Sequence, residues 1–433
     1  MNNFPAKKFL FVSWEPLSGD VVWQIKKEGH EAKVYIKTEK DKDVYDGFFE
    51  KIDKWEDYID WADVICFDDV GFGEKADELR KKGKLVVGGT KYTDDLENDR
   101  NFGQTEMKKA GMSVLPHWDF SDFDSAIKFL KENPDRYVFK PNYSFDDGGA
   151  FRNLLFLGEE DDGKDILGII ESNKKFLESK IKSFQLQKFA NGVEVAVGAF
   201  FNGEDFIYPI NVNFEHKRLF PGEIGPFTGE MGTLMYWSQP NAIFNETLLK
   251  MRDKLKESGY VGYIDINCIA NTYGIFPLEF TSRFGYPTIS IQMEGILTPI
   301  GEFLYKLANK EKFELKIKKG FQVGVLIAIP SYISENPHDI STYSDLSILF
   351  RRPNPNFEGI HIGDVKLIDS QLRVAGSSGH VLIVTGSGQT VEEARKQAYN
   401  RVKNIRLQNM FYRVDIGTRW YQESDKLQIW GYL

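Results

Sequence analysis

Residues 262–287 alternate between apolar and polar side chains with a period of two, and this pattern constrains the fold more than any other feature of the chain. A period of two is typical of β-strands, and the Asn-Thr-Tyr-Gly sequence in the middle is typical of a turn. We therefore predict a β-hairpin with a loop at 271–275, one apolar face and one polar face. With this loop, two cross-strand pairs share the polar face: Asn267 with Glu279, and Asp265 with Thr281.

The polar groups of this predicted face are almost all oxygen ligands, and Arg283 follows at its end. Oxygen-only clusters suit Mg²⁺, which keeps part of its water and shares phosphate oxygens with a nucleotide. The pattern therefore indicates a magnesium–nucleotide site. The alternative is that this face is the solvated side of an antiparallel sheet. The apolar face of the second strand should carry Phe276, Leu278 and Phe280.

The first 90 residues alternate apolar, strand-like runs with helical patterns, which is typical of a doubly wound parallel α/β unit. A loop at 15–20 follows the first strand, where such folds bind anions on helix N-terminal amides. The alternative for Ser18 and Asp20 is simple helix capping. A GxGxxG fingerprint is absent, so dinucleotide binding is not expected. The expected strands are 8–13, 32–35, 61–67 and 85–88, and the expected helices are 21–27 and 73–82.

Two further stretches have the composition of anion-binding segments. Lys140 interrupts an apolar strand expected at 137–141, and a charged residue in that setting needs a partner. The loop at 142–150 carries paired glycines and is able to close over phosphates, although an ordinary hairpin is the alternative. Three basic residues at 216–218 precede a glycine-rich stretch that ends in GPFTGEMG (225–232). They indicate either an anion site or a charged surface face.

Composition excludes several classes of protein. The net charge of −9 argues against a general nucleic-acid binder, and the apolar runs are too short to span a membrane. Cys66 and Cys268 both lie in apolar runs and fit buried thiols in a reducing compartment. No Ser-His-Asp or Cys-His arrangement indicates a side-chain nucleophile. We expect a cytoplasmic protein of two to four domains.

From residue 324 onward, short strands and an amphipathic helix expected at 390–404 predict a small α+β domain. The order of motifs along the chain resembles the ATP-grasp superfamily, and more closely the phosphoribosylamine–glycine ligase family. The C-terminal segment is the most specific part of the resemblance, because ATP-grasp enzymes in general lack that domain. The matching motifs are FKP (139–141), EHKR (215–218), GPFTGEMG (225–232), LEFTSRFGYPT (278–288) and residues 390–419.

The resemblance implies an α/β fold in three parts: an N-terminal Rossmann-like domain (1–93), an ATP-grasp core of two α+β lobes (94–320, with a lid lobe at about 117–186) and a small C-terminal α+β cap (321–433). It implies an ATP-dependent ligase of purine biosynthesis that joins a carboxylate to an amine through an acyl phosphate and releases ADP and phosphate. The implied cofactors are ATP and Mg²⁺ or Mn²⁺. The implied partners are small molecules, an amino-acid carboxylate and an amine, with no nucleic acid or membrane, in a monomer or homodimer.

The resemblance also implies roles for individual residues. The ATP-binding set is Arg100, Lys140, Gly148, Gly149, Gln187, Phe189, Ala190 and Glu194. Glu279 matches the principal metal ligand and Asn267 a second one, and the predicted polar face adds Asp265 and Thr281. Lys140 and Arg283 are the catalytic residues, and Arg283 faces the transferring phosphate and the acyl group. The substrate-binding set is Ser18, Gly19, Lys217, Arg218, Thr228, Gly229 and Tyr286.

The chain departs from the family pattern mainly on the acceptor side. Thr281 replaces an asparagine, FGDPE becomes FGYPT at 284–288, and Phe227 and Glu230 replace the asparagine and second glycine of PNTGGMG. The glycine-loop lysine is missing, and residues 15–20 replace GGREHA. We predict a less acidic, more aromatic acceptor pocket, lined by 15–20, 225–232 and 286–288. The alternatives are a relative that ligates a different amino acid or amine, a non-catalytic nucleotide-binding protein, and a phosphotransferase.

Overall fold

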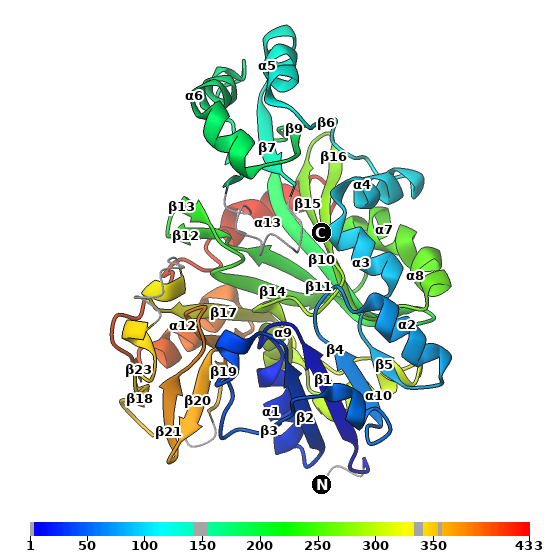
Figure 1. Cartoon of the computed structure of the whole chain (residues 1–433), viewed down its shortest axis with the longest axis vertical. Coiled ribbons are helices and arrows are strands. Elements are labelled where there is room, and N and C mark those ends of the chain that lie inside the picture. The colour runs from blue at the N-terminus through cyan, green and yellow to red at the C-terminus, as the bar shows by residue number, and fades with distance from the viewer. Residues whose placement is uncertain (1–3, 143–153, 333–340, 354–356) are drawn as a thin grey trace.

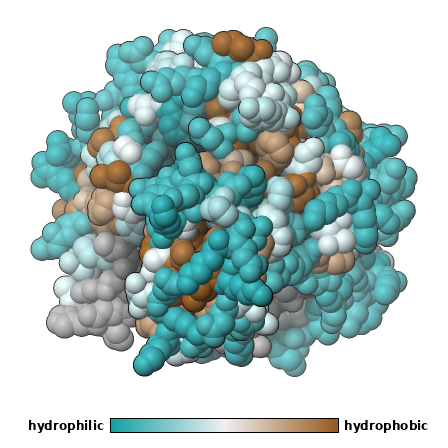
Figure 2. All heavy atoms as spheres, turned by 90° about the horizontal axis from the view of Figure 1, so that it is seen from above, coloured by the Kyte–Doolittle hydropathy of each residue, from teal (hydrophilic) through white to brown (hydrophobic). Residues whose placement is uncertain are grey.

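The computed structural model describes residues 4–142, 154–332, 341–353 and 357–433. Along its long axis lie a parallel sheet at one end, a large antiparallel sheet in the middle and a small lid at the other end (Figure 1). Seen from above, the surface is mainly hydrophilic, with apolar residues in small groups (Figure 2). Within the described ranges, no helix combines the length and the apolar character that crossing a bilayer requires.

The N-terminal sheet is parallel, as the alternation of strands and helices predicts. Its strand order is β3-β2-β1-β4-β5, with β1 (Lys8–Ser13) buried in the centre. The third predicted strand is shorter than expected and begins at Val64, and the short edge strand β3 was not predicted. The other elements are α1 (Gly19–Lys27), β2 (Glu31–Ile36), β3 (Glu50–Lys51), β4 (Val64–Phe67), α2 (Gly73–Lys81) and β5 (Val86–Val87).

The central sheet has eight strands in the order β16-β15-β10-β11-β14-β17-β22-β19. Strand β14 comes before the predicted domain boundary at residue 320 and strand β17 comes after it, and the two strands pair with each other. The predicted boundary therefore divides one sheet. The C-terminal segment therefore extends the central sheet. The strands are β10 (Val193–Asn202), β11 (Phe206–Glu215), β14 (Gly232–Ser238), β15 (Val261–Asn271), β16 (Gly274–Thr281), β17 (Phe321–Ala328), β19 (Ile360–Ile362) and β22 (His380–Gly388).

The lid is a four-stranded sheet, β6-β9-β7-β8, covered by two helices (Figure 1). It has an apolar core of its own, in which the rings of Phe123 and Phe184 stack with centroids 4.5 Å apart. This core is separate from the main core, so the lid packs as a unit. Its elements are β6 (His117–Phe120), α5 (Phe123–Glu132), β7 (Tyr137–Pro141), β8 (Phe156–Leu157), α6 (Lys164–Lys180) and β9 (Phe184–Lys188).

The predicted hairpin forms as β15 and β16. The predicted register of its polar residues is confirmed, because Asn267 pairs with Glu279 and Asp265 with Thr281. The five-residue loop is wrong, because Asn271 already pairs with Gly274. A bulge between Asn267 and Cys268 shifts the register by one residue and compensates. Beyond the bulge the faces of β16 exchange. The buried residues there are Ile275 and Pro277, while the predicted Phe276 and Leu278 are only partly buried.

The remaining helices lie around the sheets. The helical segment before the hairpin is broken at Thr247 into α7 (Ala242–Glu246), a 3-10 turn and α8 (Arg252–Ser258). The glycine-rich stretch after residue 215 contains a short hairpin, β12 (Arg218–Phe220) and β13 (Ile224–Phe227). The other helices are α3 (Lys91–Asn98), α4 (Arg100–Lys109), α9 (Thr288–Gly295), α10 (Ile300–Ala308), α12 (Val391–Val402) and α13 (Trp420–Ile429). The other strands are β18 (Leu349–Phe350), β20 (Val365–Ile368), β21 (Gln371–Val374) and β23 (Ile405–Arg406).

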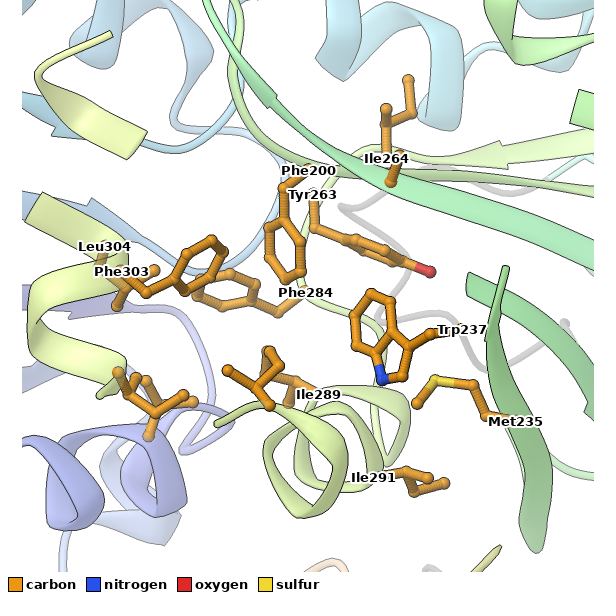
Figure 3. Close-up of a cluster of buried hydrophobic side chains, with 14 of the residues drawn as sticks. Phe200, Met235, Trp237, Tyr263, Ile264, Phe284, Ile289, Ile291, Phe303 and Leu304 are labelled. Atoms are coloured by element: carbon orange, nitrogen blue, oxygen red, sulfur yellow. The ribbon is translucent and has the colours of Figure 1, made fainter. Parts of the chain in front are cut away.

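A large apolar core lies between the central sheet and helices α9 and α10 (Figure 3). The ring of Phe303 on α10 packs edge-on against Phe200 on β10, with centroids 4.7 Å apart. Tyr263 belongs to the same cluster and is fully buried. Because side chains alternate along a strand, Tyr263 shares its face of β15 with Asp265. The apolar core therefore gives way to polar residues along one strand.

Candidate functional site

A polar cavity of about 270 Å³ lies against the hairpin. A second cavity of about 280 Å³ lies beside α3 and α4, and Glu97, Asn98 and Glu279 line both. We call the two together the cleft. The hairpin residues predicted to lie together all line the first cavity: Asp265, Asn267, Glu279 and Thr281.

Lys217 lies at the centre of a cluster of carboxylates. Its Nζ atom is 3.0 Å from Glu194 Oε1 and 3.4 Å from Glu215 Oε2. Glu279 Oε1 lies 3.7 Å from the same atom. Burial opposes the charge on Lys217, but the three carboxylates raise its pKa well above the usual value. The ammonium group therefore stays protonated and joins strands β10, β11 and β16.

Two cations meet near the junction of the lid and the core. Lys140 lies on the lid strand β7, and Arg100 begins α4. The Arg100 Nη1 atom donates hydrogen bonds to Asn142 Oδ1 at 3.0 Å and to Pro141 O at 3.3 Å. Burial and the nearby Arg100 charge lower the pKa of Lys140 to about 8. The pair forms a local positive patch of the kind that binds phosphate oxygens.

Arg283 is held by two carboxylates from other elements. Its Nε atom lies 3.0 Å from Glu97 Oε1 on α3 and 3.3 Å from Asp69 Oδ1, just after β4. Burial opposes the charge, but Glu97 and Asp69 raise the pKa of Arg283. Sequence reasoning identified Arg283 but not its partners, which come from distant segments. Nothing in the local pattern distinguishes Glu97 from Asp94 and Asp95, the other acidic residues of α3.

The inner end of the cavity is acidic. Asp265 and Glu230 are 3% and 7% exposed. Burial, with the neighbouring Glu215 charge, raises the pKa of Asp265 to about 8 and raises that of Glu230 as well. The comparison with the family's pocket stays a prediction, but the cavity is acidic, because several elements bring carboxylates to it. The carboxylates that line the cavity are Glu97, Glu215, Glu230, Asp265 and Glu279.

Comparison with known proteins decides the family. Residues 98–289 match the ATP-grasp (A) domain of phosphoribosylglycinamide synthetase, and residues 324–419 match its C domain. The chain belongs to the phosphoribosylglycinamide synthetase family of ATP-grasp ligases. The resemblance in the motif order and the α/β fold with an ATP-grasp core are thereby confirmed.

Relatives and solved structures agree with this family. The phosphoribosylamine–glycine ligase of Listeria innocua is 26% identical over 336 residues, which is 75% of this chain and 76% of that protein. That of Streptococcus suis is 24% identical over 84% of this chain and 85% of its own length. The crystal structure of the Thermotoga maritima phosphoribosylamine–glycine ligase shares the fold, with a TM-score of 0.70 at 20% identity, over 95% of this chain and 100% of that one. A biotin carboxylase from Campylobacter jejuni also shares it, with a TM-score of 0.64 at 12% identity, over 98% and 97%.

In this member of the synthetase family, the expected adenine-binding residues lie where β9 leaves the lid. Gln187 is buried, and its Nε2 atom has no hydrogen-bond partner in the described part of the chain. The Arg136 guanidinium lies over the Phe189 ring at 3.6 Å, and Ala190 follows the strand. An orphaned buried amide is consistent with a ligand edge at this position. Gly148 and Gly149, expected in the ATP-binding loop, lie outside the described residues.

The loop at 15–20 differs from the anion site expected for the family. Ser18 makes no capping hydrogen bond, and Ser18 and Gly19 line neither cavity of the cleft. The buried Asp68 carboxylate accepts a hydrogen bond from Ser13 Oγ at 2.5 Å and another from Ser18. A side chain at Gly19 would overlap the Tyr45 ring, which fills the adjacent space. A phosphate at this loop would therefore lie near a buried acidic group.

Asp20, the other candidate cap of α1, connects separate parts of the synthetase fold. Its carboxylate accepts a hydrogen bond from Ser290 Oγ at 2.9 Å and lies 2.7 Å from His361 Nδ1. It therefore joins the N-terminal domain to α9 and to β19.

The expected substrate-binding residues of the 217–229 segment separate into two groups. Thr228 and Gly229 line the cavity, and Thr228 Oγ1 donates to the Lys217 carbonyl at 2.9 Å. Arg218 lies outside it, because its guanidinium covers the Phe227 ring at 3.6 Å within the β12–β13 hairpin. Phe227 therefore does not make the cavity more aromatic. Tyr286 does line it, and its buried hydroxyl lacks a hydrogen-bond partner among the described residues.

A buried arginine joins this segment to the C domain. The nearest ligand atoms of His216, Glu223 and Asp415 all lie within 4.8 Å of one another, as in a metal site. However, the Arg413 Nη2 atom lies among them, 2.7 Å from Asp415 Oδ2, 2.5 Å from Glu223 Oε1 and 3.1 Å from His216 Nδ1. A fixed guanidinium therefore supplies the positive charge. Hydrogen bonds from His216 and Arg413 overcome the effect of burial and lower the pKa of Glu223 to about 2.

Proposed function

We propose that the protein uses ATP to activate a carboxylate as an acyl phosphate and joins it to an amine. The observation that carries the proposal is a cluster of charges where the lid meets the core. Lys140 of the lid lies close enough to Lys217 and Glu279 for their charges to affect its pKa, and Glu279 lines the cleft. Cations able to hold phosphates and oxygen ligands able to hold a divalent ion are what phosphoryl transfer requires. The relatives are phosphoribosylamine–glycine ligases, so phosphoribosylamine and glycine are the first candidate substrates.

The nucleotide would lie between the lid and the core. Lys140 and Arg100 would contact its phosphates, and Glu194 would accept hydrogen bonds from its ribose hydroxyls. The adenine would lie at the end of β9, where Gln187 has an unpaired amide nitrogen. These roles follow the family pattern and are supported by the arrangement of the side chains around the cleft.

The divalent ion would be held by Glu279 and Asn267, with Asp265 and Thr281 beside them. This donor set consists of oxygen atoms, which Mg²⁺ and Mn²⁺ prefer, and all four side chains line one cavity. The set therefore fits the ion. When bound, the ion would neutralise charge on the transferring phosphate.

The proposed chemistry needs no side-chain nucleophile. A substrate carboxylate oxygen attacks the γ-phosphorus of ATP, and ADP leaves. The amine nitrogen then attacks the carbonyl carbon of the acyl phosphate, phosphate leaves, and the nitrogen loses a proton. Arg283, fixed by Glu97 and Asp69, would face the transferring phosphate and the acyl oxygen. A guanidinium that is already held in place stabilises developing charge with little reorganisation.

An ADP-release screen tests the function. The purified chain with ATP and Mg²⁺ would be offered glycine with phosphoribosylamine, and then other amino acids with other amines, while product masses are recorded. We expect ADP only when both partners are present, together with an amide product. Nucleotide binding without ADP release from any pair would support the non-catalytic alternative. A phosphorylated product without an amide would support a phosphotransferase.

A second candidate is ligation of an amine other than phosphoribosylamine. The buried Asp68 carboxyl group beside the 15–20 loop favours it, because an acidic group there disfavours the phosphate of phosphoribosylamine. We also infer a reducing, cytoplasmic location, since Cys66 and Cys268 are buried free thiols.

The reaction should lose efficiency in alkali because of Lys140. Its pKa is about 8, so the charge that binds phosphate is present below that pH and is lost as the pH rises through it. We expect kcat/KM for ATP to fall about tenfold per pH unit above pH about 8. Lys140→Arg should flatten this profile, because a guanidinium stays protonated. At neutral pH, Lys140→Ala should weaken ATP binding by about 1.5–3 kcal/mol. A flat wild-type profile up to pH about 9.5 would contradict this role.

A further inference from the structure

Among the described residues of the cavity that lies against the hairpin, some carboxylates pair with a cation and others do not. Lys217 is held by Glu194, Glu215 and Glu279. Arg283 is held by Asp69 and Glu97. These are the two cations that line this cavity. Within the described residues, no ion pair joins Glu230 or Asp265 to a cation.

Glu230 and Asp265 are nevertheless shielded from bulk water. They are 7% and 3% exposed, and both line the cavity. Thr233 donates a hydrogen bond to Glu230 Oε1, but the buried Asp265 Oδ1 has no partner among the described residues. A cation that uses the free acceptors of a buried carboxylate stabilises its charged form. Both side chains therefore offer acceptors to a small cationic donor inside the cavity.

We propose that Glu230 and Asp265 form a subsite for a primary ammonium group of a substrate. This inference rests on the proposed ligase function, which brings an amino acid and an amine to the cleft. An ammonium group carries three donors and is small enough for a cavity of about 270 Å³ that also admits the reacting carboxylate. Its charge would be matched by the carboxylates that lack a cation. An anionic group placed between these two carboxylates would be repelled, so the reacting carboxylate would lie toward Arg283 instead.

Two sources of the ammonium group share this chemistry. It belongs either to the amino-acid donor, next to the carboxylate that ATP activates, or to a second amino group on the acceptor. Glycine and glycolate differ only in this group and probe the donor. Ethylenediamine and ethanolamine probe the acceptor in the same way.

The experiment compares the wild type with Glu230→Gln, which keeps the shape and removes the charge. Binding of the four probes is measured by calorimetry with Mg²⁺ and a non-hydrolysable ATP analogue, and turnover by ADP release. We expect the wild type to prefer one ammonium probe over its hydroxyl partner. Glu230→Gln should reduce that preference about 10- to 100-fold, with less than a twofold change in the KM for ATP. Glu230→Asp should retain most of the preference.

Several outcomes would overturn the subsite. One is an unchanged preference in a Glu230→Gln variant that melts like the wild type. Another is a Glu230→Gln variant that keeps the preference for the ammonium probe but binds Mn²⁺ more weakly, because the two carboxylates would then hold the metal. Failure of the wild type to bind either ammonium probe overturns it as well. Failure of the ligase function is a different result, since the probes would then bind without any release of ADP.

Discussion

Glu279→Gln should abolish Mg²⁺-dependent release of ADP while the melting temperature stays within a few degrees of the wild type. Glu279 pairs with Asn267 across the hairpin, and its side chain is 59% exposed, so the fold depends little on its charge. An amide replaces one carboxylate oxygen by a nitrogen that cannot bind a cation. We expect a loss of at least about 100-fold in kcat/KM, the upper range found for outer-shell metal partners.

The matched control for this variant is Glu257→Gln on α8. Glu257 forms an exposed pair with Lys254, with side chains 67% and 55% exposed, and it lines neither cavity of the cleft. Its turnover and Mn²⁺ affinity should equal those of the wild type. Near-normal turnover in Glu279→Gln would remove the metal-ligand assignment, whereas a large fall in melting temperature would show that the charge supports the fold.

Arg413→Met should cause the largest loss of stability. The Arg413 side chain is fully buried, and removing it leaves Glu223, Asp415 and His216 around an uncharged group. Breaking one partner of a buried ion pair costs about 3–5 kcal/mol. The side chains of Glu223 and Asp415 are 39% and 21% exposed, so water screens part of this interaction. We therefore expect the free energy of unfolding, measured with urea, to fall by about 2–4 kcal/mol.

The control is Arg252→Met, whose partner Asp253 is 81% exposed. A surface pair of this kind is worth about 0–1 kcal/mol. The difference between Arg413→Met and the wild type should also depend on pH. The lowered pKa of Glu223 contributes stability above its unfolded value, and this stability is lost as the pH falls toward about 2. A cost for Arg413→Met equal to that of the control would mean that the network does not stabilise the fold.

Local patterns predict much of this fold and little of its long-range assembly. The strands of the N-terminal unit and the register of the hairpin follow from alternation that is visible in short windows. The bulge in the hairpin does not follow from such a short window, because one extra residue leaves the composition of the strand unchanged. Its nearest signal is Pro277, since proline within a strand favours edges and bulges. The extension of the central sheet into the C domain is invisible locally, because β17 has the same composition whichever strand it pairs with.

The site divides in the same way. Residues on one strand pair, such as Asn267 and Glu279, can be placed together from their spacing alone. The cluster around Lys217 combines the consecutive strands β10 and β11 with the distant strand β16, and the partners of Arg283 come from α3 and the segment after β4. Motif comparison located many of these residues individually. It did not predict the acidic lining of the cavity, because that lining depends on which segments meet.

The central sheet sets limits on recombining this protein with its relatives. The ladder from Tyr236–Phe321 to Gly232–Val325 lies directly across the junction at 320. A chimaera spliced there would have to rebuild that ladder from two parents, and a poor match would leave β14 as an open edge prone to aggregation. The lid is different, because its apolar residues pack among themselves. Exchange of the lid between family members is therefore the graft that this architecture tolerates best.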